Sequence, residues 1–509
     1  MNHLLRGGLL WAACFWAASA GAAAPPNVIV FLVDDMGWQD TSVPFHTQRT
    51  PWNDRYRTPH MERLAASGMK FTQAYACPVC TPTRVSLMTG LNAARHRATN
   101  WTLHKDTPTD AKHPTIQPPA WNVNGLSPDP ATPRAVCAAT LAQLLRECGY
   151  RTIHVGKAHF GAVDTPGAEP RNLGFDVNVA GHAAGGPGSY LAEQGFSAAW
   201  RKGSRIWDVP GLEAYHGKDI FLTEALTLEA NKAVDRAVAD KRPFFLYLAH
   251  YAVHVPYAPD KRFIQKYRDA GLDETEAMYA ALVEGMDKSL GDVLGNVDRH
   301  GLADNTIVIF LSDNGGLSAH GRGGTPHTHN TPLSSGKGSA REGGIRVPML
   351  VRWPGVVKPG STCNQYVMVD DILPTVLEMT GLEMTGADKR IAKRPQVDGV
   401  SIVPLLRGGA GYPAERVLVW HYPHVWGPKG PGLGPFSAVR RGDWKLIYYY
   451  EDRRLELFNL ADDLGEEENL ASENPQRLRE MTKLLAERLQ SLGAQMPSDK
   501  RTGQPVQTP

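Results

Sequence analysis

Near its N-terminus the chain reads Val28-Ile29-Val30-Phe31-Leu32-Val33-Asp34-Asp35, six large apolar residues followed directly by two aspartates. An unbroken apolar run is typical of a strand that is buried on both faces of a sheet. Similar strand-like runs recur at 152–155, 244–249, 306–311 and 348–351. Between them, apolar residues recur at helical spacing over 223–239 and 274–297. This alternation predicts an α/β fold, with a large mixed, mostly parallel sheet flanked by helices.

The second helical segment carries an apolar stripe at Met278, Leu282, Met286 and Leu290. Side chains four residues apart lie on the same face of a helix, so this stripe is expected to face the core. We interpret it as core packing and not as a cofactor site.

The composition changes after about residue 411. Short strand-like runs follow one another, joined by turns such as Arg441-Gly442-Asp443, and a helix is expected over 475–492. The expected strands lie at 417–420, 437–440, 444–450 and 455–459. We therefore predict a large α/β domain over 25–410 and a small C-terminal subdomain over 411–495, an antiparallel sheet with one helix. The tail at 496–509 is polar and is predicted to be disordered.

The first 24 residues are typical of a secretory signal peptide. Arg6 precedes an apolar run, and the small residues Ala20-Gly21-Ala22 or Ala22-Ala23-Ala24 could form the cleavage site. This predicts a secreted protein, periplasmic or extracellular, with no membrane span, because no later run approaches ~20 apolar residues. The 509 residues carry a formal net charge of only +2, which argues against a nucleic-acid partner.

Six cysteines are distributed unevenly along the chain. Cys14 lies in the predicted signal peptide, and Cys80 lies in a motif described below. The remaining four allow three disulfide pairings, and the sequence does not choose among them. They are Cys77, Cys137, Cys148 and Cys363.

Acidic side chains follow two of the predicted strands directly. Asp34 and Asp35 follow the first strand, and Asp313 and Asn314 follow the run at 306–311. In open parallel sheets, ligands bind beyond the carboxyl ends of the strands, so these side chains can converge on one cation. A lone Asp-Asp pair is more often a cap or turn, but two such groups favour a metal site. Oxygen ligands suit Ca²⁺, with Mg²⁺ as the alternative, better than zinc.

A second motif reads Cys80-Thr81-Pro82-Thr83-Arg84 and begins a helix-like run that continues to Gly90. Proline suits the first turn of a helix, where its missing N–H is not needed. Cys80 would then lie near the positive end of a helix, where free N–H groups attract an anion. Cys77-Pro78-Val79-Cys80 could instead be a redox or zinc motif, but no second pair with zinc spacing follows.

The pentapeptide resembles the signature Cys-x-Pro-x-Arg of the type I sulfatases, which have an alkaline-phosphatase-like fold. In that family the cysteine is oxidised to formylglycine, whose hydrate is the nucleophile and a metal ligand. The resemblance implies that Cys80 undergoes this change, and that a formylglycine-generating or anaerobic sulfatase-maturating enzyme acts on the chain. It also implies that Arg84 contacts the hydrated aldehyde and the metal carboxylates, and that the metal is held by Asp34, Asp35, Asp313, Asn314 and residue 80.

Three further segments are similar to the family. Gly156-Lys157-Ala158-His159-Phe160-Gly161 resembles the sulfatase segment Gly-Lys-Trp-His-Leu-Gly, with Ala158 and Phe160 as departures. The resemblance implies that Lys157 bridges aldehyde and sulfate, and that His159 accepts a proton from the second hydroxyl. It likewise implies that His254 contacts sulfate and protonates the leaving oxygen, and that Lys337 binds sulfate.

The resemblance implies a sulfuric ester hydrolase, and a sulfated carbohydrate is the expected substrate. Histidines on glycine-rich or aromatic loops, His182, His327 and His424, are the candidate substrate contacts, with Trp426 nearby in sequence. Two alternatives remain: a phosphonate monoester or phosphodiester hydrolase of the same superfamily, and a non-catalytic glycan-binding protein on the same fold. The sugar, the sulfated position and the oligomeric state are not indicated by the sequence.

Overall fold

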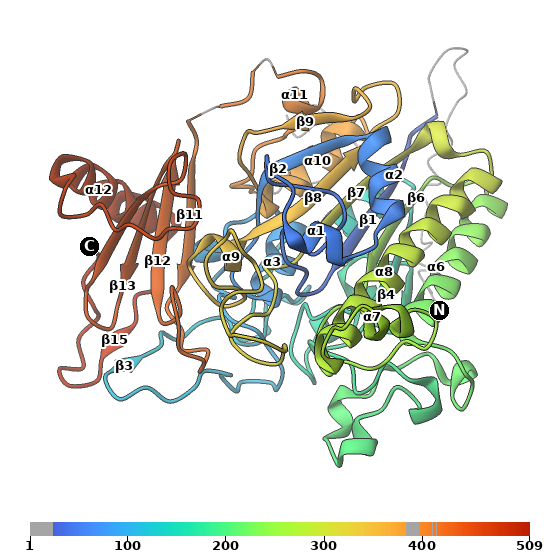
Figure 1. The fold of residues 1–509 in the computed structure, drawn as a ribbon, viewed down its shortest axis with the longest axis horizontal. Helices are drawn as coiled ribbons and strands as arrows, with labels where there is room; N and C mark the ends of the chain where they lie inside the picture. Colours follow the sequence, from blue (N-terminus) through green and yellow to red (C-terminus); the bar gives the residue numbers. More distant parts are fainter. Residues whose placement is uncertain (1–23, 383–395, 410, 414) are drawn as a thin grey trace, which may run out of the picture.

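The computed structural model describes residues 24–382, 396–409, 411–413 and 415–509 (Figure 1). The predicted signal peptide lies outside these residues except for Ala24. Within the described ranges, no helix is long and apolar enough to cross a membrane.

A nine-stranded sheet forms the centre of the larger part of the molecule. Its strand order is β10-β2-β8-β7-β1-β6-β4-β5, and β9 pairs with β2 beside this path. Only β8 runs antiparallel to its neighbours, β7 and β2, so the prediction of a mixed, mostly parallel sheet is confirmed. The strands are β1 (Asn27–Val33), β2 (Met69–Tyr75), β4 (Arg151–Gly156), β5 (Val177–Val179), β6 (Phe244–Ala249), β7 (Thr306–Ser312), β8 (Arg346–Arg352), β9 (Ser361–Cys363) and β10 (Val367–Met368).

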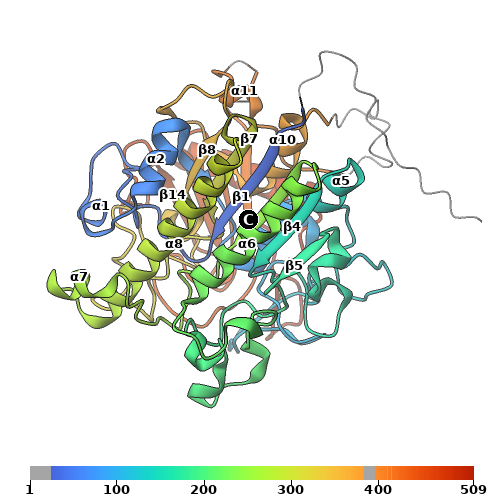
Figure 2. The same ribbon diagram turned by 90° about the vertical axis from the view of Figure 1, so that its right-hand side faces the viewer.

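Helices cover both faces of this sheet. Successive side chains of β1 point to opposite faces, and they join two separate cores. Val28, Val30 and Leu32 pack on the side of α3 (Cys80–Thr89), α5 (Leu141–Glu147) and α10 (Ile372–Met379). Ile29 and Phe31 pack on the side of α2 (Pro59–Ser67), α6 (Leu222–Ala239) and α8 (Glu274–Arg299), and Figure 2 shows α6 and α8 lying over this face. The continuous apolar sequence of β1 is explained by burial on both sides.

The long helix α8 contains the predicted stripe. Leu282, Met286 and Leu290 are fully buried, whereas Met278 is only partly buried at the edge of the same core. Asp273 caps the helix by accepting hydrogen bonds from the N–H groups of Thr275 and Glu276. The remaining helices are shorter: α1 (Pro51–Arg55), α4 (Ala93–His96), α7 (Ile264–Asp269), α9 (Glu342–Ile345) and α11 (Val403–Leu406).

The C-terminal part is a four-stranded antiparallel sheet with one helix, as predicted. Its strands are β11 (Val417–Tyr422), β12 (Phe436–Arg441), β13 (Trp444–Tyr449) and β14 (Leu455–Asn459), and its helix is α12 (Pro475–Leu492). Val419 and Leu446 pack against α12, whereas Leu418 and Trp420 join the core of the large sheet. The small sheet is therefore attached to the larger part by a shared core, visible at the left of Figure 1.

The prediction of a disordered tail is wrong over 498–506. Ser498–Asp499 form strand β15, which pairs antiparallel with β3 (Ile116–Gln117), and Val506 is 4% exposed. The polar composition of the tail gave no sign of this strand. Its partner, β3, lies almost 400 residues earlier in the chain.

Candidate active site

The acidic pairs predicted at two strand ends lie next to each other. β1 pairs in parallel with β7, and Val33 lies opposite Ser312, so Asp34 and Asp313 follow from adjacent positions. The N–H of Asp35 donates to Asp313 Oδ1 at 3.3 Å, and Asn314 Nδ2 donates to Asp35 Oδ1 at 2.8 Å. All four side chains are buried. The parallel pairing of the two strands therefore creates one oxygen-rich cluster.

Strand β6, on the other side of β1, brings His254 to this cluster. The N–H of Asp34 donates to the carbonyl of Ala252 at 2.9 Å, and the N–H of Val253 donates to the carbonyl of Asp34 at 2.7 Å. These two backbone bonds place the His254 imidazole so that its Nε2 lies 3.7 Å from Asp35 Oδ2.

Cys80 is the first residue of α3, which follows strand β2. Its side chain lies in a helix whose residues are all buried, at the N-terminal end where backbone N–H groups have no partner within the helix. Burial raises the pKa of the Cys80 thiol, although Lys157 and Lys337 oppose the rise. An unmodified thiol here is therefore neutral and a weak nucleophile near pH 7.

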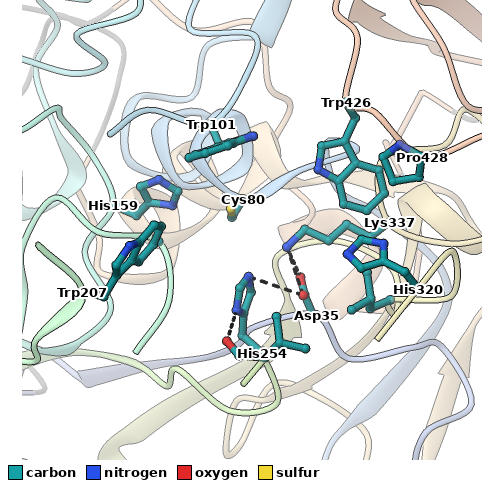
Figure 3. Close-up of a pocket in the computed structure, with 13 residues that line it drawn as sticks. Asp35, Cys80, Trp101, His159, Trp207, His254, His320, Lys337, Trp426 and Pro428 are labelled. Carbon is teal, nitrogen blue, oxygen red and sulfur yellow. Dashed lines mark hydrogen bonds and ion pairs between the residues drawn. The ribbon is translucent and has the colours of Figure 1, made fainter. Parts of the chain in front are cut away.

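Each carboxylate of the cluster pairs with one buried cation. Arg84 donates through Nε and Nη2 to Asp313 Oδ2, at 3.0 and 2.8 Å. Lys157 Nζ lies 2.6 Å from Asp34 Oδ2. Lys337 Nζ lies 2.7 Å from Asp35 Oδ1 (Figure 3). Three buried carboxylates thus face three buried cations.

The three cations do not offset the cost of burial for every carboxylate, because the pKa values of Asp34 and Asp35 shift in opposite directions. Burial raises the pKa of Asp34 well above its ordinary value, and the neighbouring charge of Asp313 adds to the rise. Burial would also raise the pKa of Asp35, but Lys337, His254 and Lys157 together hold it below its ordinary value.

Two oxygens of the cluster are left without a hydrogen-bond partner among the described residues, Asp34 Oδ1 and Asn314 Oδ1. Oxygen atoms of Asp34 and Asp35 and a nitrogen of His254 also lie within 4.8 Å of one another. Buried oxygens without a donor are costly unless a cation or water completes them, so the residues fit a hard divalent cation.

Two imidazoles face the site with defined tautomers. His254 Nδ1 lies 2.7 Å from the carbonyl of Val255, so Nδ1 carries a proton and Nε2 is directed toward Asp35. His159 Nε2 lies 2.8 Å from the carbonyl of Thr102, so Nε2 carries the proton. His159 Nδ1 is buried and has no partner in the described part of the chain. His159 therefore presents a lone pair, as a proton acceptor must.

The turn after the two aspartates is held by a buried polar group that the sequence did not reveal. Asp40 Oδ2 accepts from the N–H of Gly37 at 3.0 Å and from Arg322 Nη1 at 3.2 Å. The Arg322 guanidinium also pairs with Glu276 on α8 and lies 3.7 Å from the centroid of the Tyr279 ring. These contacts tie the end of β1 to a helix.

A cavity of about 460 Å³ opens above Cys80 (Figure 3). Five of the predicted residues lie in its lining: Asp35, Cys80, His159, His254 and Lys337. The sequence pointed to Trp426 and to the glycine-rich loop of His182, which contains Gly185, but not to the remaining residues of the wall, because nothing in their local sequence marks them. The additional lining residues are Trp101, Gly185, Trp207, Val255, Leu317, His320, Trp426 and Pro428.

The three histidines predicted to contact substrate do not line this cavity, so that prediction is not supported. His424 is fully buried between Thr99 Oγ1 and Asp110 Oδ1, both 2.7 Å from its ring nitrogens. His182 contributes its carbonyl, which accepts from the N–H of His159 at 3.1 Å. His327 has a positive φ of 68° and packs closely against Gly430.

The question of disulfide pairing is answered for three of the four cysteines. Cys77 and Cys363 are buried free thiols, and Cys137 is an exposed free thiol. Cys77 also forms no disulfide with Cys80, which is free. A redox-active Cys-x-x-Cys disulfide is therefore not present in this structure.

The chain is similar in sequence to known proteins along most of its length. The sulfatase family profile matches residues 26–382, and a profile described as N-sulphoglucosamine sulphohydrolase, C-terminal, matches 337–495. A protein named sulfatase from Formosa agariphila is 32% identical, over 88% of this chain and 85% of its own. The N-acetylgalactosamine-6-sulfatase of Canis lupus familiaris is 29% identical, over 92% of this chain and 80% of its own.

A solved structure supports the same assignment. The crystal structure of Ps i-CgsB in complex with k-i-k-neocarrahexaose superimposes with a TM-score of 0.69 and 26% identity, covering 92% of this chain and 93% of that chain. The match of the family profile to most of the larger part, together with the arrangement of β1, β7 and α3, shows that this chain belongs to the type I sulfatase family of sulfuric ester hydrolases.

Proposed function

We propose that this enzyme hydrolyses sulfate esters of carbohydrates, with formylglycine at position 80 and a divalent cation, Ca²⁺ or Mg²⁺, in the acidic cluster. One observation carries the proposal: Cys80 lies in the lining of a cavity together with His159, His254 and Lys337, beside the buried carboxylates. The names of the relatives are consistent with a sulfated carbohydrate, because one is an N-acetylgalactosamine-6-sulfatase and a solved neighbour holds a neocarrahexaose.

The cation would be held by Asp34, Asp35, Asp313 and Asn314, together with residue 80. The two oxygens without partners, Asp34 Oδ1 and Asn314 Oδ1, support this choice. When bound, the cation supplies positive charge and Lewis acidity beside the sulfate. A ring nitrogen of His254 also lies within 4.8 Å of carboxylate oxygens of Asp34 and Asp35, but a set made mainly of carboxylate and amide oxygens favours Ca²⁺ or Mg²⁺ over zinc.

The residues around the cavity divide the remaining tasks. When formed, formylglycine supplies the nucleophilic oxygen at position 80. Lys157 and Lys337 are the cations that neutralise charge on the sulfate, as cationic clamps do in phosphoryl transfer. Arg84 is bound to Asp313 and to the carbonyl of Lys157 at 2.7 Å, so it holds these two groups in place. Its contact with position 80 stays a prediction.

His254 and His159 have opposite roles in this proposal. His254 directs Nε2 toward the cavity, where a protonated imidazole can donate to the leaving oxygen. Burial, followed by the charge of Lys337, lowers the pKa of His254 to about 3. An anionic ester in the cavity would raise the pKa of the imidazole, so substrate binding should favour uptake of a proton from water by His254. His159 has its free lone pair at Nδ1 and accepts a proton.

We further propose that the chain is exported through its first 24 residues and is matured by a formylglycine-generating or anaerobic sulfatase-maturating enzyme. Most of the residues that line the cavity are uncharged, and the net charge of the chain is only +2. Neither observation supports a nucleic-acid partner. The proposed domain limits are 25–410 and 411–495, with the shared core joining them.

Turnover of matched esters tests the proposal. Full-length enzyme made in a host that modifies the cysteine should hydrolyse a nitrophenyl sulfate and defined sulfated sugars faster than the corresponding phosphodiesters. Cys80→Ala should abolish turnover while leaving the circular dichroism spectrum and the unfolding midpoint unchanged. A preference for the phosphodiester would favour the phosphodiesterase alternative. Tight binding of sulfated sugars without any turnover would favour the glycan-binding alternative.

A further inference from the structure

The walls of the cavity above Cys80 are aromatic. Trp101, Trp207 and Trp426 all lie in its lining, and each is partly exposed. In Figure 3, Trp207 and Trp426 lie on opposite sides of Cys80, and Trp101 lies above it. No other described residue accepts a hydrogen bond from their indole N–H groups. Three apolar faces with unused N–H donors thus surround the space where the leaving group of the ester must lie.

Two of these tryptophans, Trp101 and Trp426, lie against segments that reach the reacting centre. Next to Trp101, the N–H of Thr102 donates to Thr81 Oγ1 at 3.2 Å, and the carbonyl of Thr102 contacts His159. Trp426 packs on Gly338, where an added Cβ would lie 2.4 Å from the indole ring. Gly338 has a φ of 84° and follows Lys337 directly. Trp426 therefore lies against the segment of Lys337, and Trp101 is the neighbour of a residue that contacts His159.

The charge of the wall is low. Among the described residues that line the cavity, Asp35 is the only carboxylate and Lys337 the only lysine or arginine, and these two pair with each other at 2.7 Å. Burial, followed by the charge of Lys337, lowers the pKa of His320, so this imidazole is neutral at physiological pH. Outside the lining, Arg205 is paired with Asp208 at 3.0 Å, and Lys429 is exposed beside Pro428.

We propose that the cavity selects an electrically neutral sugar ring whose only anionic group is the reacting sulfate, and that Trp101, Trp207 and Trp426 contact this ring. The inference rests on the proposed sulfate-ester hydrolysis. A pyranose ring presents C–H groups on its faces and hydroxyls at its rim, which match indole faces and indole N–H donors. A carboxylate or second sulfate on the same sugar would be brought against these rings without a cation to pair with it, which is costly.

Paired substrates test the selectivity. Matured full-length enzyme is assayed on methyl galactosides and methyl glucosides that carry one sulfate at each hydroxyl in turn. The best monosulfate is then compared with the same sugar carrying a second sulfate or a carboxyl group at another position. We expect kcat/KM to fall by about tenfold or more with the second anion, the fold-change of a single unpaired polar contact. Equal or faster turnover of the doubly anionic sugar would overturn the inference.

Tryptophan variants test the contact. Trp207→Ala and Trp426→Ala, each combined with Cys80→Ala, are titrated with the best monosulfate by calorimetry, and Trp200→Ala is the matched control. Trp200 is 52% exposed and lies outside the cavity lining. The two wall variants should weaken binding by about tenfold each, whereas the control should not. Unchanged binding in both wall variants would refute the aromatic contact.

The outcomes separate this inference from the proposed function. If matured enzyme hydrolyses no sulfate ester, the proposed function is wrong and the selectivity falls with it. If it hydrolyses sulfate esters but prefers doubly anionic sugars, the proposed selectivity alone is wrong. If neither Trp207→Ala nor Trp426→Ala weakens binding, the proposed ring contact alone is wrong. A Lys429→Ala variant identifies one cause: loss of a preference for doubly anionic sugars would show that Lys429 pairs with the second anion.

Discussion

Lys445 offers a sharp test of how the small sheet is joined to the site. Its side chain on β13 is fully buried, and its Nζ lies 2.8 Å from a carboxylate oxygen of Glu342 and 2.8 Å from one of Glu466. Glu342 begins α9, and the carbonyl of Gly344 in that helix accepts from the N–H of Gly315, the residue after Asn314. Lys445→Met removes the charge and keeps most of the volume, so two buried carboxylates lose their shared cation.

The structure sets the size of the effect. Burial raises the pKa of Glu342, but Lys445, Arg346 and Arg440 together lower it from 4.5 to about 2. That shift corresponds to about 3 kcal/mol of differential stabilisation. Removal of one partner from a buried pair costs ~3–5 kcal/mol. We therefore expect Lys445→Met to lower the free energy of unfolding by about 3 kcal/mol or more near pH 7.

The difference in stability between wild type and Lys445→Met should depend on pH in a defined direction. Because the pKa of Glu342 is lower in the folded state, its stabilisation is present above its unfolded pKa and is lost as the pH falls toward 2. In Lys445→Met that carboxyl titrates at a higher pH. The difference in stability between wild type and variant should therefore be largest at neutral pH and shrink as the pH is lowered from about 5.

Equilibrium unfolding in urea, followed by circular dichroism at several pH values, measures this difference. Lys483→Met is the matched control, because Lys483 pairs with Glu487 at 3.8 Å while 78% exposed, and it should change stability by less than about 0.5 kcal/mol. Adding Glu466→Gln to Lys445→Met should recover part of the loss, since one unpaired charge is removed. A loss as small as that of the control, or one independent of pH, would refute the reasoning.

The remaining predictions concern the reacting groups. In active enzyme the peptide carrying residue 80 should be about 18 Da lighter than its cysteine form by mass spectrometry, and full activity with an unmodified thiol would contradict the mechanism. Chelation should abolish activity, calcium or magnesium should restore it, and Asp313→Ala should reduce the bound metal measured by plasma emission; chelated enzyme that stays active would exclude the cation. His254→Ala should lower kcat/KM on a sugar sulfate by ~10²–10⁴-fold and less on nitrophenyl sulfate, whereas equal losses would mean that the imidazole only holds sulfate. His159→Ala should lower kcat on both substrates, and an unchanged kcat would exclude it as the base.

Local patterns were sufficient for the elements that carry the chemistry. The apolar run before Asp34 is a strand because its burial on both faces requires an unbroken apolar sequence. The helix over 475–492 begins and ends at the predicted residues, since Pro475 starts it and Gly493, with a φ of 65°, ends it. The motif at Cys80 likewise begins a helix as predicted, because its signal lies within a few residues of sequence.

Local patterns failed where a side chain's role depends on a distant partner. His424 has an aromatic neighbourhood in sequence, but in the fold it is enclosed by Thr99 and Asp110 and cannot reach a ligand. The tail was predicted to be disordered from its polar composition, yet β15 finds a partner at β3. Each partner lies hundreds of residues away, so no window of sequence contained the information.

By itself, the sequence determined which residues could react and where along the chain the strands that present them lie, because strand burial, helix starts and motif spacing are local properties. Only the tertiary structure decided what surrounds the reacting ester. Trp101, Trp207 and Trp426 lie far apart in the chain, yet all three line one cavity with Cys80, and Trp426 packs against the core that the large sheet shares with the small C-terminal sheet. The physical reason is that side chains far apart in the chain become neighbours only when the burial of apolar surface fixes the elements that carry them.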